Sequence, residues 1–289
     1  MKKTLAVILA AMMVFTMLAF TGCNNTTPNG DTVVDTQDDV NAETPDDVVE
    51  DETPEAASDL AYIQDKGTLV IGMTDYAPMN YYEDGVLTGF DTEFAEAVAT
   101  KLGVKAEFIE IEWDSKIFEL DSKAIDCVWN GMTLTNEVMS AMNCSDAYVV
   151  NAQVVVMAAD KLADYATVED LADVTFAAEA GSAGAAAIAD AGYEATEVGT
   201  QADALMEVAA GAADACVIDI TMANAMTGEG TSYADLGYSI ALTTEEYGIG
   251  FRKDSDVTAK VNEIMAELYA DGTLPTLAEK YELTLAMAE

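Results

Sequence analysis

Histidine is absent from the sequence, and basic residues are few. The 289 residues include 53 Asp and Glu against 12 Lys and Arg, so the formal net charge is −41. Without histidine, histidine-based catalytic triads and most zinc sites are excluded. A charge of this sign repels nucleic acid and anionic membranes, and we expect neither as a direct partner. The excess acid indicates a solvated surface that keeps the protein in solution, with adaptation to salt or a cationic ligand as alternatives.

Cysteine is also scarce. The four cysteines, Cys23, Cys127, Cys144 and Cys216, show no short paired spacing of the kind that holds a metal. We therefore expect no metal and no cofactor. Cys127 and Cys144 are candidates for a disulfide in an exported protein, which would leave Cys216 unpaired in a buried strand.

The first 23 residues have the pattern of an export signal. Lys2 and Lys3 precede an apolar run over residues 5–20 that is too short for a comfortable membrane span. Its end, Phe-Thr-Gly-Cys, resembles the lipobox of bacterial lipoproteins, with Phe20 in place of the usual leucine. We predict a signal peptide over residues 1–22 and a lipid on Cys23, which would hold the protein on the extracellular face of a bacterial cell membrane. An ordinary secretory signal followed by an incidental cysteine is the alternative.

The next segment has the composition of a tether. Residues 24–58 contain no aromatic residue, no basic residue and three prolines. Such a segment cannot bury enough apolar surface to offset the entropy lost on ordering. We predict that residues 23–59, from the lipidated cysteine onward, form a disordered acidic tether ahead of the folded part.

From Gly67 to Tyr148, short apolar runs alternate with amphipathic runs, the pattern of an open α/β sheet. We predict strands over residues 69–72, 104–111 and 124–130. A helix is expected to begin at the N-cap Asp91 and end at Gly103, and a short helix to follow Trp113. Polar and aromatic residues follow the strands, which is where such sheets bind ligands.

A second α/β set follows the first. Residues 149–158 are a continuous apolar run, typical of a buried strand or a crossover. Thr167 and Asp170 then have the spacing of a capping box. The remaining pattern predicts strands over 175–178, 214–218 and 247–251. It also predicts a helix that begins within 181–184 and helices over 201–210, 256–270 and 277–281. Two α/β sets in tandem predict two lobes with a cleft between them.

Several segments, taken in order, resemble one family. They are GTLVIGMTDYAP, TGFDTEFAEAVATKLGV, the Trp-Asp pair at 113–114, IDCVWNGMTLT, SDAY, AGSAG, GAADACVID and YGIGFRKDSD. Together they resemble the extracellular solute-binding proteins of polar-amino-acid ABC transporters, over residues 60–285. The resemblance implies a periplasmic-binding-protein-like α/β fold of two lobes joined by two crossover strands. One lobe would comprise residues 60–149 plus 247–289 and the other residues 150–246, with the ligand held between them by hinge closure.

The resemblance also implies ligand-binding residues on the first lobe. Tyr76 and Trp113 correspond to the aromatic walls around the ligand side chain. Asn130, Gly131 and Thr133 correspond to the strand-end groups that hydrogen-bond the ligand's ammonium and carboxylate. The alternative for the two aromatic residues is a place in the core.

On the second lobe, the resemblance implies a helix N-terminus and an acid. Ser182, Ala183 and Gly184 would direct backbone N–H groups at the ligand's carboxylate, which gains from the helix dipole. Asp219 would pair with the α-ammonium, since a buried carboxylate needs a cation to offset its desolvation. The alternatives are that Ser182 and Asp219 only cap helices.

One position departs from the family pattern. Val138 stands where the family usually has an arginine that binds the ligand's carboxylate. Lys116 follows Trp113 by three residues, so on a helix both side chains would lie on one face towards the cleft. We predict that Lys116 supplies the missing charge, directly or through a water; the alternative is a solvated surface lysine. Arg252 is the competing substitute, but its neighbours Lys253 and Asp254 favour a surface ion pair.

The predicted function is capture of an amino acid or similar zwitterion for an ABC permease in the membrane. We expect a monomer that is not an enzyme and touches the membrane only through its lipid anchor. A ligand-sensing module for a receptor is one alternative. A dehydratase-like enzyme on the same fold is the other, since carboxylates in a closing cleft are able to exchange protons with a substrate.

Overall fold

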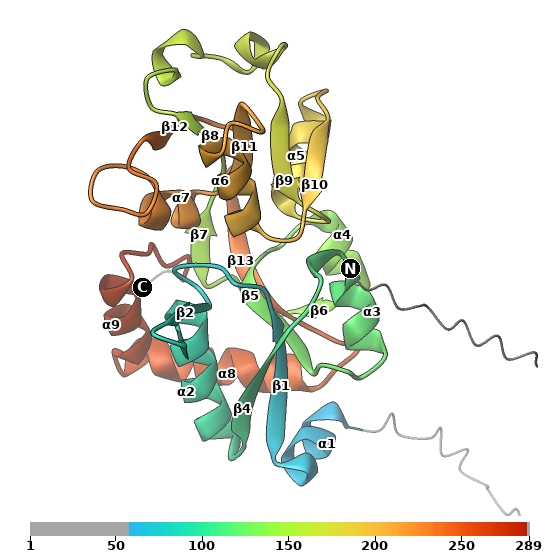
Figure 1. Ribbon diagram of the computed structural model, residues 1–289. Coiled ribbons are helices and arrows are strands. Elements are labelled where there is room, and N and C mark those ends of the chain that lie inside the picture. The colour runs from blue at the N-terminus through green and yellow to red at the C-terminus, as the bar shows by residue number, and fades with distance from the viewer. Residues whose placement is uncertain (1–57, 288–289) are drawn as a thin grey trace, which may run out of the picture. The chain divides into compact units, whose positions relative to one another are not determined.

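The computed structural model describes residues 58–287. The predicted signal peptide, Cys23 and almost all of the predicted tether lie outside the described residues. The described residues belong to one compact unit and form two mixed β-sheets, a small hairpin and flanking helices (Figure 1). No helix in residues 58–287 is long and apolar enough to cross a membrane.

The first sheet has the strand order β4-β1-β5-β13-β6, with β7 paired to β13. Its strand β1 lies parallel to β4 and β5, whereas β13 runs antiparallel to β5, β6 and β7. Parallel neighbours need a crossover, and α2 provides the one between β1 and β4. The strands are β1 (Thr68–Met73), β4 (Lys105–Glu110), β5 (Cys127–Thr133), β6 (Asn143–Cys144), β7 (Val149–Asn151) and β13 (Glu245–Phe251).

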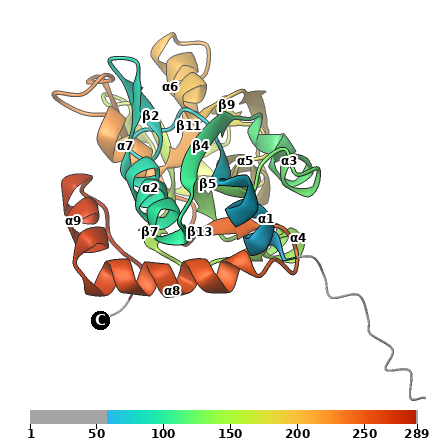
Figure 2. The ribbon, with the colours of Figure 1, turned by 90° about the horizontal axis from the view of Figure 1, so that it is seen from below.

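Helices from both ends of the described chain accompany this sheet. Figure 2 shows α2, α8 and α9 next to one another, as their contacts require. Aromatic rings fill the space beneath them: Phe94 meets Trp129 edge-on, with ring centroids 4.9 Å apart. The elements are α1 (Asp59–Lys66), α2 (Phe90–Leu102), η1 (Trp113–Ser115), α3 (Lys116–Asp121), α4 (Asn136–Ala141), α8 (Val257–Ala270) and α9 (Thr273–Lys280), with the hairpin β2 (Tyr81–Glu83) and β3 (Val86–Thr88).

The second sheet has the order β10-β9-β11-β8-β12. Its strands β9, β10 and β11 are parallel, and β8 runs antiparallel to both β11 and β12. Near-continuous burial of β8, β9 and β11 explains why they read as apolar runs in the sequence. The elements are β8 (Gln153–Ala158), η2 (Leu162–Asp164), η3 (Val168–Leu171), β9 (Phe176–Glu179), α5 (Ala183–Asp190), β10 (Ala195–Val198), α6 (Gln201–Ala209), β11 (Ala215–Asp219), α7 (Ile220–Met226) and β12 (Leu236–Ala241).

The chain passes between the two sheets twice. It leaves the first sheet at β7 and enters the second at β8 one residue later, and it returns from β12 to β13. At the crossing, β7 and β13 pair with each other, Val149 opposite Tyr247 (Figure 1). The predicted two-lobed α/β fold is confirmed, and the first sheet combines strands from both ends of the described chain.

Of two helix-capping predictions, the structure confirms one and contradicts the other. The capping box is present, because Thr167 and Asp170 exchange the reciprocal hydrogen bonds that define it. Asp91, however, is not the N-cap of α2; Gly89 occupies that position. Asp91 is instead fully buried, and its carboxylate accepts hydrogen bonds from the Gly131 N–H (2.6 Å) and the Tyr148 hydroxyl (2.9 Å).

The suggested disulfide is absent. Cys127 and Cys144 are free thiols, and Cys216 is a buried free thiol in β11. Cys127 lies opposite Phe251 and Cys144 opposite Gly250, so β13 stands between their two strands. Two strand spacings are roughly 9.5 Å, which exceeds the ~7 Å limit on the Cα separation in a disulfide.

Candidate functional site

A cavity of about 310 Å³ lies between elements of the two sheets. From the first lobe it is lined by η1, α3, the end of β5 and α4, and from the second by the segments that follow β9 and by β11. Eight of the ten predicted ligand-binding residues line it: Trp113, Lys116, Asn130, Gly131, Thr133, Ser182, Ala183 and Asp219. Residues from opposite lobes therefore meet where the sequence predicted a cleft.

Asp219 ends β11 and is 3% exposed. Its carboxylate accepts hydrogen bonds from the side-chain amides of Asn151, Gln153 and Gln201, and these partners in the described chain are all uncharged. Although Asp219 stands at the N-cap of α7, its side chain makes no capping bond. Burial raises the pKa of Asp219 to about 6, and the nearby Glu245 carboxylate adds to the rise. The group is thus a buried carboxylate without a cation among the described residues.

Glu179 is a second buried carboxyl at the cavity, and the sequence analysis missed it. It ends β9 with 2% exposure, and its Oε1 has no hydrogen-bond partner among residues 58–287. Burial, with the Asp219 charge, raises the pKa of Glu179 to about 8, despite the opposing effects of the Thr74 side chain and of Lys116. The signal that pointed to Asp219, an acid at the end of an apolar strand, is present at Glu179 too.

The N-terminus of α5 borders the same cavity. Ser182 is its N-cap, and the hydroxyl accepts a hydrogen bond from the Ala185 N–H at 3.1 Å. The preceding Gly181 has φ +67°, and a Cβ there would lie 2.8 Å from the Cα of Asp114. Only glycine lets the second lobe come this close to η1 of the first lobe.

Lys116 is buried, so the alternative that it is a solvated surface lysine is wrong. It is 8% exposed, and its ammonium group donates to the carbonyls of Trp113 (3.1 Å) and Gly181 (2.9 Å). The same group lies 4.9 Å from the centroid of the Trp113 ring. Burial lowers the pKa of Lys116, with Glu137 and Glu179 opposing the change. Trp113 and Lys116 thus share one face of the cavity, as predicted from their spacing.

The end of β5 is held in place by internal hydrogen bonds. Asn130 accepts from the N–H (3.0 Å) and hydroxyl (2.9 Å) of Thr74 and donates to the Thr74 carbonyl (3.0 Å). The Thr133 hydroxyl donates to Glu245 at 2.7 Å. Gly131 has φ +54°, and a Cβ there would lie 2.6 Å from the ring of Tyr76. These contacts fix the backbone that faces the cavity.

Tyr76 and Gly184 do not line the cavity. Tyr76 is 1% exposed, and its hydroxyl lies 2.5 Å from both the Thr221 and the Tyr247 hydroxyls. It therefore links a loop of the first lobe to α7 of the second and to the crossing strand β13. Gly184 allows α5 to pack on the sheet, since a Cβ there would lie 2.7 Å from the Val217 carbonyl oxygen. Direct ligand contact by these two residues remains a prediction.

Arg252 is not in a surface ion pair, which corrects the sequence analysis. It is 7% exposed and pairs with Asp59 (2.9 Å) and Asp126 (3.5 Å), and it does not line the cavity. Its guanidinium also donates to the carbonyl of Ile125 at 2.8 Å. Val138, by contrast, does line the cavity, as a buried residue of α4. The position that carries arginine in the family thus faces the cavity with an apolar side chain.

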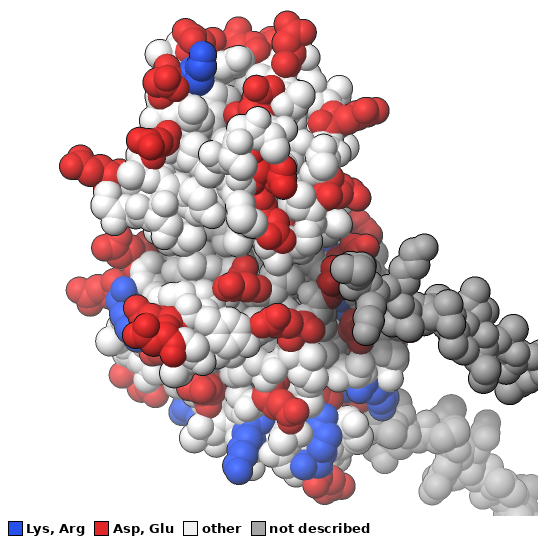
Figure 3. Space-filling model, in the orientation of Figure 1, with Lys and Arg blue, Asp and Glu red and all other residues white. Residues whose placement is uncertain are grey.

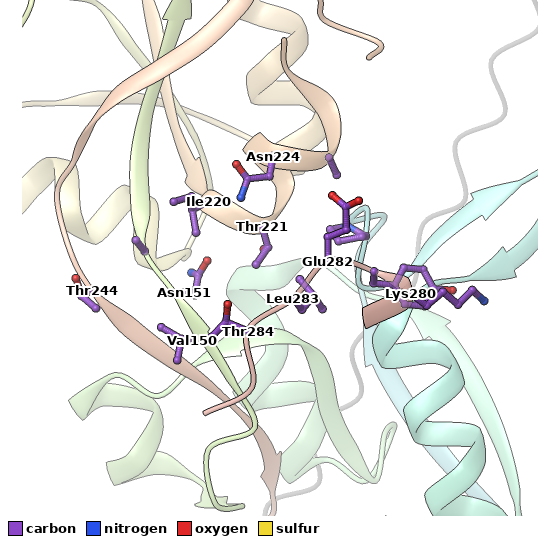
Figure 4. Close-up of a pocket in the computed structure, with 14 residues that line it drawn as sticks. Val150, Asn151, Ile220, Thr221, Asn224, Thr244, Lys280, Glu282, Leu283 and Thr284 are labelled. Atoms are coloured by element: carbon purple, nitrogen blue, oxygen red, sulfur yellow. The ribbon is translucent and has the colours of Figure 1, made fainter. Parts of the chain in front are cut away.

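Two larger cavities lie elsewhere. One, of about 680 Å³, is formed by β7, α7 and the segment after α9. Figure 4 shows Ile220, Thr221 and Asn224 on one side of it and Leu283 and Thr284 on the other. It contains none of the ten predicted residues. A further cavity, of about 620 Å³, is lined by acidic residues of both lobes. Within residues 58–287, no group of three or more Cys, Asp or Glu side chains is arranged to hold a metal ion.

Two lobes joined by paired crossing strands, with buried carboxyls and a helix N-terminus at a cavity between them, define a solute-binding protein. The sequence profile of the bacterial extracellular solute-binding proteins, family 3, matches residues 69–284, and the chain belongs to this family.

Individual members resemble the chain over most of its length. The arginine-binding extracellular protein ArtP of Bacillus subtilis (strain 168) is 32% identical over 225 residues, 75% of this chain and 86% of the relative. A substrate-binding protein of an ABC uptake transporter from Streptococcus pneumoniae, solved with bound histidine, has a TM-score of 0.71 and 29% identity over 78% of this chain and 96% of that one. AncCDT-1, an ancestral amino acid-binding protein and precursor of cyclohexadienyl dehydratase, has a TM-score of 0.71 and 32% identity over 78% of this chain and 99% of that one.

Proposed function

We propose that this protein captures an amino acid in the cavity between its lobes and delivers it to an ABC permease. The observation that carries the proposal is Asp219, a buried carboxylate at the cavity whose partners in the described chain are all neutral amides. An ammonium group of a ligand would supply the missing charge. The relatives named for arginine and histidine support the choice of an amino acid.

The carboxylate of such a ligand has two nearby sites. The N-terminus of α5, at Ser182 and Ala183, offers backbone N–H groups and the positive end of a helix dipole. Lys116 offers a positive charge. We propose that Lys116 binds the ligand's carboxylate in place of the family's arginine, because Val138, at the position of that arginine, carries no charge. Trp113 would pack against the ligand side chain, and the backbone of Gly131 and Thr133 would complete the site from the first lobe.

Capture would occur by closure of the lobes around the ligand. Lys116 and Gly181 belong to opposite lobes and are hydrogen-bonded, as are Tyr76 and Thr221. Both contacts would break if the lobes separated, so they contribute to the closed state. The backbone between the lobes bends at the two crossings, between β7 and β8 and between β12 and β13.

We also propose that the protein acts as a lipid-anchored monomer that performs no reaction. The lipobox-like end of the apolar run supports an anchor at Cys23. Both oxygens of Asp219 already accept hydrogen bonds from amides, an arrangement suited to holding a charge in place. A bound amino acid should be recovered chemically unchanged after prolonged incubation, and conversion to a product would support the dehydratase-like alternative.

Calorimetric titration of the protein with the proteinogenic amino acids tests this function. At least one should bind, and Asp219→Asn should weaken its binding by roughly ten- to a hundred-fold, since a charge-assisted hydrogen bond contributes about 1.5–3 kcal/mol. Asp173→Asn is a matched control, because Asp173 is an exposed residue of the same lobe that lines neither this cavity nor the acidic cavity beside it. Equal affinity of wild-type protein and Asp219→Asn would contradict the proposed role.

A further inference from the structure

Glu179 is the buried cavity carboxyl that the proposed function leaves unused, since Glu137 and Asp190 are exposed. Its Oε1 is buried without a hydrogen-bond partner among the described residues, and the residue lines the cavity. A buried polar atom without a partner is unfavourable, because it has lost its hydrogen bonds to water. Lys116, the one basic residue of 58–287 that lines the cavity, donates to two backbone carbonyls and forms no ion pair with Glu179. A ligand that enters the cavity is therefore in a position to supply a partner.

The charges around the cavity have the same sign. Its lining residues include four carboxyls, Glu137, Glu179, Asp190 and Asp219, and a single ammonium, Lys116. A zwitterion with no further charge would leave most of these carboxyls without compensation. The Asp219 charge opposes ionisation of Glu179, and a net positive ligand would offset that effect.

The surroundings extend this negative field. The cavity of about 620 Å³ that also touches both lobes is lined by Asp75, Glu110, Glu112, Glu119 and Asp203, with no Lys or Arg. In the second lobe, Lys161 is the only basic residue from 153 to 241. Figure 3 shows acidic side chains over much of the visible face, while most basic side chains lie over the lower part. Such a field concentrates cations near the cleft and speeds their association.

We propose that the ligand carries two cationic groups, one paired with Asp219 and the other with Glu179. This inference rests on the proposed function, because it takes the same cavity as the ligand site. The shared chemistry is a pair of ammonium or guanidinium groups on one small molecule. An amino acid with a basic side chain and a diamine are the two sources of that chemistry.

The protonation of Glu179 agrees with this assignment. Its raised pKa, about 8, means that the carboxyl keeps its proton at neutral pH in the ligand-free protein. A cation beside it favours the charged form and lowers the pKa, so the proton leaves as the ligand binds. The charged groups that influence the pKa of Glu179 are Asp219 on β11, Lys116 on α3 and Asp203 on α6, and the Thr74 side chain also lowers it.

Calorimetry with four probes tests the inference: L-lysine, L-arginine, 1,5-diaminopentane and L-norleucine. Norleucine has the α-amino and α-carboxyl groups of lysine and an unbranched side chain without the ammonium. Lysine or arginine should bind at least tenfold more tightly than norleucine. Glu179→Gln should abolish most of that difference, whereas Glu194→Gln, at an exposed residue of the same lobe outside the cavity, should keep it. The melting temperature of each ligand-free variant checks that it is folded.

The outcomes separate the inference from the proposed function. Equal or tighter binding of norleucine or another neutral amino acid would overturn the inference and leave amino-acid capture intact. Unchanged lysine and arginine affinities in folded Glu179→Gln would also overturn it. Diaminopentane that binds as tightly as lysine would support two cationic groups and identify a diamine, against the proposed amino acid. No binding of the four probes or of any amino acid would overturn both. The comparison of lysine with norleucine needs only wild-type protein.

Discussion

Lys116 in α3 of the first lobe donates a hydrogen bond of 2.9 Å to the backbone carbonyl of Gly181 in the second. The bond joins the two lobes at the edge of the cavity, directly before the N-terminus of α5. We therefore propose two contributions of Lys116 to ligand binding. It stabilises the closed arrangement of the lobes, and it places a positive charge beside the site proposed for the ligand's carboxylate.

Replacement of Lys116 by methionine removes the charge and keeps most of the side-chain volume. We expect Lys116→Met to weaken ligand binding by tenfold or more, because both the interlobe hydrogen bond and the charge are lost. Isothermal titration gives the affinity, and the melting temperature of the ligand-free protein should change little. Lys123→Met is the matched control at an exposed lysine outside the cavity. Wild-type affinity in Lys116→Met would shift carboxylate binding to the N-terminus of α5.

Gly181 should be sensitive to the addition of a single methyl group. Gly181→Ala places a Cβ 2.8 Å from the Cα of Asp114, in the opposite lobe, so full closure is obstructed. We expect at least a tenfold loss of ligand affinity. Gly192→Ala is a close control, because Gly192 also has positive φ (+87°) but a Cβ there meets nothing within 4 Å. If both variants lose the same affinity, backbone strain and not the interlobe contact is responsible.

Ligand affinity should rise with pH. In the ligand-free protein the pKa values of Asp219 and Glu179 are raised to about 6 and about 8, so below these pH values a cationic ligand must displace a proton from the group concerned. For one displaced proton the rise approaches about tenfold per pH unit below the pKa of the group concerned. Titrations at pH 6, 7 and 8 in buffers of different ionisation enthalpy measure both the slope and the protons released. Glu179→Gln should flatten the rise between pH 7 and 8.

Asp219 and Glu179 also make the stability of the ligand-free fold depend on pH. This contribution to stability falls as pH rises, whereas ligand affinity increases. Because their pKa values are higher in the folded protein than the ordinary 3.8 and 4.5, the folded chain binds more protons than the unfolded chain. The stability this contributes is complete below those ordinary values and is lost as pH rises through about 8. Ligand-free Glu179→Gln should therefore gain thermal stability relative to wild type as pH rises from 5 to 8. A constant difference between the two proteins across this range would contradict the assignment.

The lipid anchor is tested by mass spectrometry. In a bacterial host, the mature protein in the membrane fraction should begin at Cys23 and carry a diacylated cysteine, because one acyl chain alone gives only marginal membrane binding. Cys23→Ser should appear in the medium or periplasm without lipid. A wild-type protein that begins at another residue and lacks lipid would favour an ordinary secretory signal.

The sequence predicted features that depend on neighbours along the chain. The alternation of strands and helices, the capping box at Thr167 and the acid at the end of β11 all follow from local pattern. Asp91 was assigned wrongly because an acid near the start of a helix suggests a cap, whereas its partners are Gly131 and Tyr148. Both contacts arise only when β5 and the segment before β7 pack against α2.

The surroundings of Arg252 and Glu179 also depend on contacts between distant segments, which the local sequence does not predict. Lys253 and Asp254 suggested that Arg252 lies in a surface pair, but its carboxylate partner Asp59 is 193 residues away in sequence. Glu179 appears in the sequence as the last residue of an apolar strand. Its importance depends on the cavity beside it, which forms only when the two lobes meet. Pairing and burial between distant segments are not encoded in any local pattern.

The placement of the two tryptophans makes intrinsic fluorescence a readout of ligand binding. Trp113 lines the cavity with the Lys116 ammonium over its ring, whereas Trp129 is fully buried in the first lobe against Phe94. A ligand that moves that ammonium or displaces water from the indole alters the emission of Trp113, while Trp129 supplies a constant background. Replacing Trp129 with phenylalanine would leave Trp113 as the single tryptophan, so ligand binding can be followed in real time by tryptophan emission without an attached dye.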